Sequence, residues 1–90
     1  MYNVKSILDF MDKAVKMVES ASPLATALGI PFVEQIAKIA DTAINVGQNA
    51  IARKDDVNVI LTSKDETEIN AHIVKLDAIN AELNAKILAS

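Results

Sequence analysis

Residues 31–53 read PFVEQIAKIADTAINVGQNAIAR and carry apolar side chains around most of a helix. Two neighbouring apolar rows keep the three-and-four spacing of a helix face. The rows consist of Val33, Ile36, Ala37, Ala40, Ile44 and Ile51, and of Phe32, Ile36, Ile39, Ala43, Val46 and Ala50. An ordinary surface helix has an apolar face of about 100°, and a wider face needs cover on more than one side. We therefore predict that this helix lies in the middle of the fold and is its most buried helix.

The predicted central helix has marked ends and a small residue within it. Pro31 suits the first turn, whose N–H groups have no helical partner, and Gly29 suits the end of a preceding turn. Arg53 and Lys54 place positive charge at the negative end of the helix dipole. Gly47 costs about 1 kcal/mol of helix propensity relative to alanine, so we expect close packing to compensate for it.

A first helix is predicted over about residues 3–20. Its leading apolar row repeats by steps of four and three and consists of Val4, Leu8, Met11, Val15 and Val18. A second row widens the apolar face and consists of Ile7, Phe10, Ala14 and Met17. Residues 22–30 are predicted to form a short helical corner, because Ser22-Pro23 opens the segment and Gly29 ends it. The apolar residues of this corner are expected to pack on the bundle or on another subunit.

The acidic connector 54–63 leaves alternatives open. Four of its residues have strand propensity, namely Val57, Val59, Ile60 and Leu61. A lone strand would lack a partner, because every other segment has a helical pattern. We predict a loop or a short helical turn capped by Asp55 or Asp56, with the apolar residues anchored on the core. A strand contributed to a sheet between molecules is the alternative.

A last helix is predicted over residues 64–89, with a capping box from Ser63 to Glu66. Its heptad seam consists of Ile69, Ile73, Leu76, Asn80, Leu83 and Ile87. A second flank of mostly small residues consists of Ala71, Val74, Ala78, Ala81, Ala85 and Leu88. An asparagine on such a seam can fix the register and the oligomeric state. Asn80 has that role, or it lies at the edge of the seam and bonds to a backbone carbonyl or to water.

Composition indicates one all-α domain over residues 1–90, built as a three-helix bundle with antiparallel neighbours. The chain has 51% hydrophobic residues, three aromatic residues and no cysteine, which excludes disulfides and thiolate metal sites. The net charge is −3, and its acidity gathers in residues 55–68. The chain shows no basic patch, which argues against direct nucleic-acid binding. We expect neither a signal peptide nor a membrane-spanning segment.

Residues with catalytic or metal-binding chemistry are few. His72 is the only histidine, and Glu68 lies four residues before it. We weigh a metal ligand or a pH-sensitive contact against a partly exposed helix residue, and we favour the last, because a metal or catalytic site needs further partners. The acidic connector lacks the alternating oxygen ligands and the glycine of a calcium loop. With no phosphate loop or nucleophile elbow either, we expect no enzymatic activity, cofactor or metal.

The chain as a whole resembles small helical proteins encoded in bacteriophage genomes, particularly near virion structural genes. The resemblance rests on the alanine-rich helical plan, on SPLATALGIP leading into VEQIAKIADTAINVGQNAIA, and on the ending INAELNAKILAS. It implies a virion component or an assembly accessory that acts by packing many copies together, in the virion or the host cytoplasm. It implies a role for no particular residue.

Three helices in ninety residues have limited capacity to cover one another's apolar faces. We therefore predict self-association or binding to a larger protein assembly. The candidate interface residues are Ile69, Ile73, Leu76, Asn80, Leu83 and Ile87 on the last helix, and Leu24, Leu28, Ile30 and Phe32 at the corner. One alternative is a membrane-surface protein, although its polar faces lack the expected Lys/Arg bias. Another is a small regulatory or antitoxin-like module that covers a partner with its acidic end.

Overall fold

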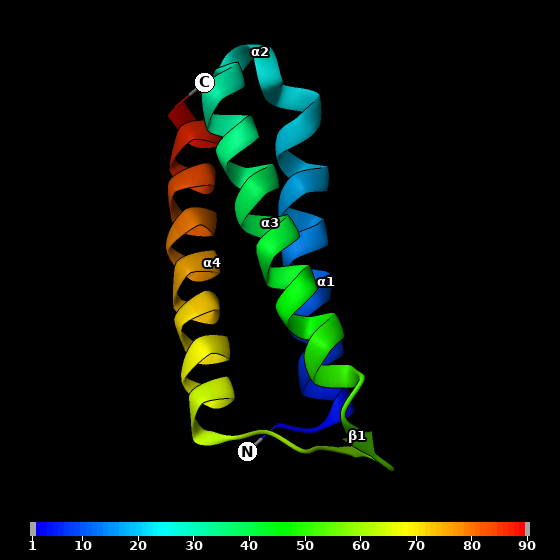
Figure 1. Cartoon of the computed structure of the whole chain (residues 1–90). Coiled ribbons are helices and arrows are strands. Elements are labelled where there is room, and N and C mark those ends of the chain that lie inside the picture. Colours follow the sequence, from blue (N-terminus) through cyan, green and yellow to red (C-terminus); the bar gives the residue numbers. More distant parts are fainter. Residues whose placement is uncertain (1, 90) are drawn as a thin grey trace.

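Three long helices run up, down and up along a rod of 44 × 19 × 18 Å in the computed structural model (Figure 1). The structure describes residues 2–89, so positions 1 and 90 of the predicted domain lie outside it. The helices are α1 (Val4–Ala21), a 3-10 turn η1 (Ser22–Leu24), α2 (Ala25–Leu28), α3 (Ile30–Ile51) and α4 (Ser63–Ala89). Two short strands, β1 (Lys54–Asp55) and β2 (Asn58–Val59), precede α4. The predicted all-α fold is confirmed.

Small residues bring α1 and α3 close together. Gly47 of α3 lies directly against Met11 of α1, and a Cβ atom at this glycine would lie 2.7 Å from the Met11 sulfur. That separation is shorter than a van der Waals contact, so the glycine is needed for the observed helix spacing. Ala14 on α1 and Ala40 and Ala43 on α3 are fully buried along the same pair. The close packing predicted around Gly47 is present.

The apolar rows that are buried in the structure differ in part from the rows that the sequence pattern puts first. The buried residues of α1 are Ile7, Phe10, Ala14, Met17 and Ala21, so its second predicted row forms the core. Those of α3 are Ile36, Ile39, Ala40, Ala43, Gly47 and Ala50. Those of α4 are Ile69, Leu76, Ile79 and Leu83. The central helix thus has the most buried residues, although α1 is buried as fully over its shorter length.

The corner between α1 and α3 follows the sequence prediction. Gly29 ends α2 with a φ of 94°, a backbone conformation that residues with a Cβ rarely adopt. Pro31 lies in the first turn of α3. Leu28 is buried in the larger of two core clusters, and Leu24 packs against the same cluster. The corner therefore closes the upper end of the bundle.

The predicted conformation of the connector is wrong, because residues 54–59 form a β-hairpin. Lys54 pairs with Val59 and Asp55 with Asn58 in antiparallel register. Asp56 caps no helical turn and lies at the tip with a φ of 58°, which aspartate tolerates better than most residues. The sequence left a strand in the connector without a partner, and the structure supplies one from the connector itself, because β1 pairs with β2. Only Val59 reaches a buried position, in the second core cluster beside Ile7 and Ile69.

The start of α4 corrects the predicted capping box by one residue. Thr62, not Ser63, is the cap: its Oγ1 accepts from the Asp65 N–H at 3.2 Å. The Asp65 carboxylate accepts in return from the Thr62 N–H at 3.0 Å, which completes the reciprocal pair. The Arg53 guanidinium donates to the same carboxylate at 2.6 Å, so the end of α3 is joined to the start of α4. The third position of the box therefore holds Asp65 instead of Glu66.

The Gly47–Met11 contact predicts a reversal of sign in a double-mutant cycle. Gly47→Ala should destabilise the natural chain by about 1 kcal/mol, because the overlap with Met11 outweighs the gain in helix propensity. In a Met11→Ala background the same change should stabilise the fold by up to about 1 kcal/mol. Urea unfolding of the four chains, followed by circular dichroism, measures both differences. Equal effects in the two backgrounds would show that the contact does not limit helix spacing.

Candidate functional site

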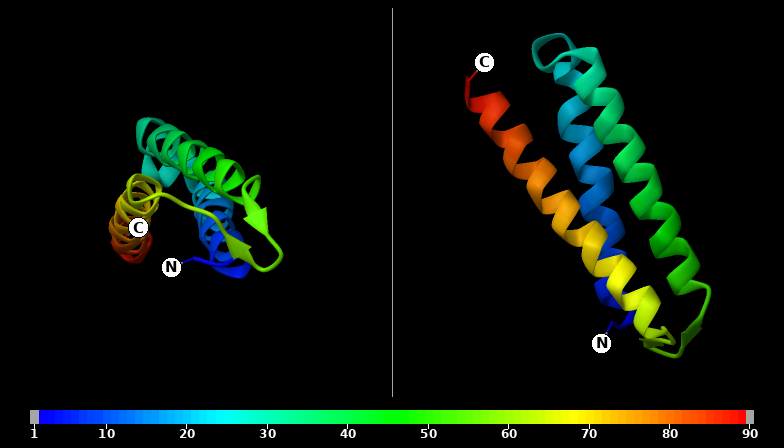
Figure 2. Two further views of the ribbon diagram at one scale, coloured as in Figure 1. Left: turned by 60° about the horizontal axis from the view of Figure 1, so that its bottom comes forward. Right: turned by 60° about the vertical axis from the view of Figure 1, so that its left-hand side comes forward.

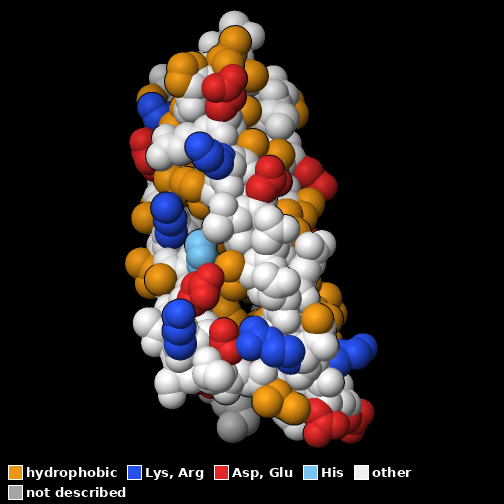
Figure 3. All heavy atoms as spheres, in the orientation of Figure 1, with side chains coloured by type: hydrophobic (Ala, Val, Ile, Leu, Met, Phe, Trp, Pro, Cys, Tyr) orange, Lys and Arg blue, Asp and Glu red, His pale blue; other side chains and the backbone are white. Residues whose placement is uncertain are grey.

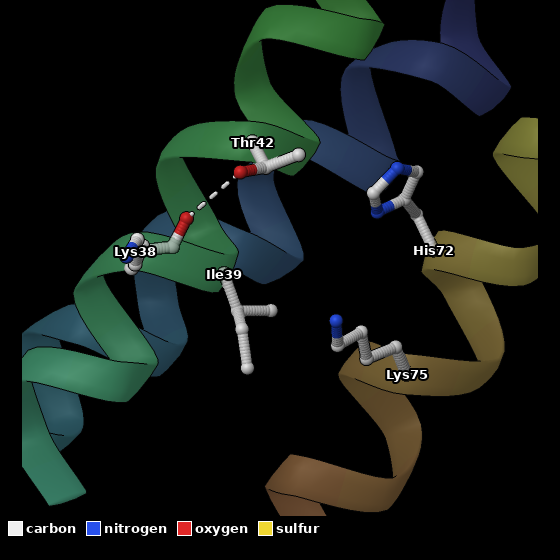
Figure 4. A pocket seen from close by; sticks show the side chains of 5 residues that line it. All are labelled: Lys38, Ile39, Thr42, His72 and Lys75. Atoms are coloured by element: carbon white, nitrogen blue, oxygen red, sulfur yellow. Dashed lines mark hydrogen bonds between the residues drawn. The ribbon is translucent and has the colours of Figure 1, made fainter.

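A shallow groove lies between α3 and α4. It encloses about 220 Å³ and is lined by Lys38, Ile39, Thr42, His72 and Lys75. Figure 4 shows the His72 ring and the Lys75 side chain reaching from α4 across the space towards α3. The Thr42 hydroxyl donates to the Lys38 carbonyl oxygen at 3.0 Å, so its proton is already engaged. The groove can attract an anion, but it has neither a carboxylate nor an activated nucleophile for catalysis.

His72 is half-buried on α4, which agrees with the interpretation as a partly exposed helix residue. Glu68 is not among the residues that line the groove with it. Residues 2–89 contain no group of three or more histidine, cysteine or acidic side chains placed to hold a metal ion. The groove therefore gives His72 two lysines as cationic neighbours and no ligand partner.

The second hollow, of about 90 Å³, lies at the lower end of the same two helices. It includes the ion pair of Arg53 with Asp65 and, next to it, Glu68. The Thr62 N–H, the Arg53 guanidinium and the Thr62 hydroxyl, in that order, lower the pKa of Asp65 from 3.8 to about 2. Asp65, in the first turn of α4, thus holds the start of that helix, while Asp55 and Asp56 lie on the exposed hairpin.

The predicted interface on α4 lies largely inside the chain's own core. Ile69, Leu76 and Leu83 are at most 2% exposed, so a second copy cannot reach them while the bundle is closed. Ile73 and Ile87 are half-buried and pack against the same core. Asn80 is also half-buried. The sequence missed Ile79, which is buried one turn from Leu76 and Leu83 and could have been found from that spacing.

The predicted interface at the corner is divided between core and surface. Leu28 is buried, and Leu24 and Phe32 pack against the core. The Lys86 ammonium lies 4.9 Å from the centre of the Phe32 ring, a cation–π contact that joins the ends of α3 and α4. Ile30 is 62% exposed and is the only one of the four corner candidates that a partner can reach freely.

Other exposed apolar residues were not among the predicted interface positions. In the described part of the chain they are Leu8 and Val15 on α1, Val57 and Ile60 at the hairpin, and Val74 and Leu88 on α4. The signal for the first two was present, since both belong to the leading row of the first helix. Spacing alone does not say which side of a helix another helix covers, so the sequence does not show that these two residues stay exposed.

Comparisons with protein-family models, curated proteins and solved structures found no match. Within residues 2–89, the helices lack the combination of length and apolar character that crossing a bilayer requires. The candidate site with the most structural support is therefore the exposed apolar surface of the bundle, and the polar groove comes second.

The burial of the α4 seam predicts a contrast between two neighbouring positions. Leu76→Ala should destabilise the chain by about 2–5 kcal/mol, because it opens a cavity in the core. Val74→Ala removes an exposed side chain and should change stability by no more than about 0.5 kcal/mol. Urea unfolding at two protein concentrations checks both values. A Leu76→Ala effect that grows with concentration would place this residue between chains instead.

The Asp65 carboxylate predicts a loss of stability in acid. Its pKa is lower in the folded chain than the ordinary 3.8, so its stabilising effect is complete above that value and disappears as the pH falls to about 2. The natural chain should lose more stability than Asp65→Asn between about pH 5 and pH 2, because the amide does not titrate. Denaturant midpoints at both pH values measure the loss. Asp55→Asn removes an exposed carboxylate outside the cap, and an equal effect of both substitutions would contradict this role.

Proposed function

We propose that the chain is a non-enzymatic interaction protein that acts by helix packing in a multi-copy assembly. The proposal is carried by the apolar surface that remains after the three long helices have closed their core. In the part of the chain described, seven large apolar side chains are exposed: Leu8, Val15, Ile30, Val57, Ile60, Val74 and Leu88. Scattered apolar residues are ordinary on a small protein, but neighbouring ones mark a contact surface.

The distribution of these side chains supports more than one contact per chain. Ile30 lies at the upper end of the rod, while Val57 and Ile60 lie at the hairpin at the lower end (Figure 1). Leu8 and Val15 lie along α1 between the two ends. A subunit with apolar groups at both ends and along one side suits an assembly in which each copy has several neighbours.

The polar side chains support the same proposal, because several of them join one helix to another. Arg53 and Asp65 join α3 to the cap of α4, and Lys13 pairs with Asp77 to join α1 to α4. The Tyr2 hydroxyl donates to the Asn70 side chain, and this hydrogen bond joins the N-terminal end of the chain to α4. These groups hold helices together and are therefore explained by structure alone.

A virion is the assembly that we propose first, because the chain resembles helical proteins encoded near bacteriophage structural genes. A virion component is used in many copies, and a short, cysteine-free helical rod with apolar ends is suited to repeated packing. The proposed activity needs no bound cofactor.

The native mass of the purified chain tests the proposed function. One chain has a mass of 9.7 kDa. We expect light scattering after size exclusion to give at least about twice the mass of one chain, with a larger share of oligomer at higher concentration, because association follows mass action. A mass of one chain over a hundredfold range of concentration, in a soluble and helical sample, would contradict the proposal.

A further inference from the structure

One apolar row on α1 has heptad spacing but is only partly covered by the chain's own core, against which Val4, Met11 and Val18 pack. The row consists of Val4, Leu8, Met11, Val15 and Val18. Leu8 is 50% exposed and Val15 is 39% exposed, whereas the other three are half-buried. The fully buried row is a different one, which includes Ile7 and Ala14. A row with alternating steps of four and three is the pattern that packs against another helix.

Contacts with the neighbouring helices show on which side of α1 this row lies. Met11 lies against Gly47 of α3, whereas Lys13 pairs with Asp77 of α4. Leu8 is three residues before Met11 and Val15 is four residues after it, so both share its side of the helix. The row therefore lies at the border of α1 with α3, on the side turned away from α4.

A matching row runs along α3. Ile44 is three residues before Gly47 and Ile51 is four residues after it, and both are half-buried. Val33 and Ala37 extend this row towards the start of the helix and are also half-buried. We call the two rows together the outer face; its members are Val4, Leu8, Met11, Val15 and Val18 of α1 and Val33, Ala37, Ile44 and Ile51 of α3.

Figure 2 shows α4 on one side of the α1–α3 pair, and the outer face belongs to the opposite side. In Figure 3, apolar side chains appear along the right-hand margin among acidic and basic ones, and others appear along the left-hand margin over α4. The hairpin adjoins the lower end of this face, because the Val4 N–H donates to the Val57 carbonyl oxygen at 2.8 Å. Within the described residues, α1 and α3 are thus covered by a helix on one side only.

Charges beside the outer face favour a second copy of the same chain as its cover. The border of α1 carries charges of both signs, at Lys5, Asp9, Asp12, Lys16 and Glu19, and within the chain Lys5 pairs with Asp9 and Lys16 with Asp12. A parallel copy would place each charge opposite its own kind. An antiparallel copy can set Leu8 opposite Val18 and Met11 opposite Val15. In this register, Lys5 and the other copy's Glu19 are separated by about 3 Å along the helix axis. Lys16 then lies equally close to the level of the other copy's Asp12 and closer to that of its Asp9, while the two copies of Asp12 also lie about 3 Å apart along the axis.

The same arrangement is acceptable on α3. Because Met11 lies level with Gly47, the two-fold axis passes near Ile44, and the two copies of this side chain meet there. The acids that border α3 are Glu34 and Asp41, and in this register neither lies opposite an acid of the α3 helix of the other copy. In this register, contacts between opposite charges therefore outnumber contacts between like charges.

We infer that two copies of the chain pack antiparallel through the outer face, so that their α1 and α3 helices form a four-helix bundle of two layers. The inference rests on the proposed function, since it names one contact of the multi-copy assembly. It leaves α4, the corner and the hairpin tip of each copy free for other neighbours.

Charge substitutions on two helices separate this interface from the others. Leu8→Glu and Val15→Glu should each raise the dissociation constant of the dimer about 10-fold or more, because the interface would bury an unpaired carboxylate. Val74→Glu places the same charge on α4, where the native side chain is 68% exposed, and should leave the dimer unchanged. Sedimentation equilibrium measures the constants, and circular dichroism confirms that each variant is folded.

The outcomes distinguish the inference from the proposed function. An oligomer that responds to Val74→Glu but not to Leu8→Glu or Val15→Glu would overturn the outer-face contact and leave the proposed function standing. A natural chain that is monomeric at every concentration would overturn both. If the outer face instead binds lipid, the natural chain would be monomeric alone and would bind vesicles of phosphatidylglycerol and phosphatidylcholine, which also overturns the inference.

Cross-linking tests the antiparallel direction, because the natural chain has no cysteine to interfere. Lys5→Cys chains mixed with Glu19→Cys chains should form a mixed disulfide under air oxidation. Lys5→Cys chains alone should cross-link far less, since the two sulfurs would lie about 24 Å apart along the axis. Efficient cross-linking of Lys5→Cys with itself would indicate a parallel pair and overturn the proposed arrangement.

Discussion

The close approach of α1 and α3 is the constraint on which the rest of the structure depends. It requires a residue without a side chain at Gly47, where Met11 occupies the space that a Cβ atom would take. Ala14 and Ala40 keep the same spacing along the pair. Small residues on the contact line leave the larger apolar side chains on either side of it, because those side chains do not fit between helices at this distance. The pair therefore has two apolar sides, and one further helix covers only one of them.

Helix α4 completes the core on that one side with larger side chains. Leu76 and Leu83 are buried against the helix pair, so α4 packs through longer side chains than those on the contact line of α1 and α3. Polar contacts join α4 to the other two helices along its lower half, from the cap at Asp65 to the ion pair of Asp77 with Lys13. Its opposite flank, which includes Val74, stays exposed.

The hairpin explains how a short connector spans two helix ends while contributing to the core. Val59 seals the lower core cluster, and Arg53 reaches from the end of α3 to the cap of α4. The polar residues of this end are thus occupied with structure. The candidates for function are therefore surfaces and not reactive groups. Among the surfaces, the outer face of α1 and α3 has a regular helical spacing that the other exposed apolar residues lack.

The sequence by itself determined the three helices, the corner at Gly29 and the apolar periodicity of each helix, because these depend on local spacing and on turn residues. Only the tertiary structure decided which apolar row is buried. Ile7 and Leu8 are adjacent and similar in size, yet Ile7 is fully buried and Leu8 is half exposed. The same holds for Thr62 as the cap, since Asp65 is fixed there by Arg53, which lies just after the end of α3. It also holds for the hairpin, whose Val59 is buried against Ile7 and Ile69. Each of these outcomes depends on contacts between distant segments, which local spacing does not encode.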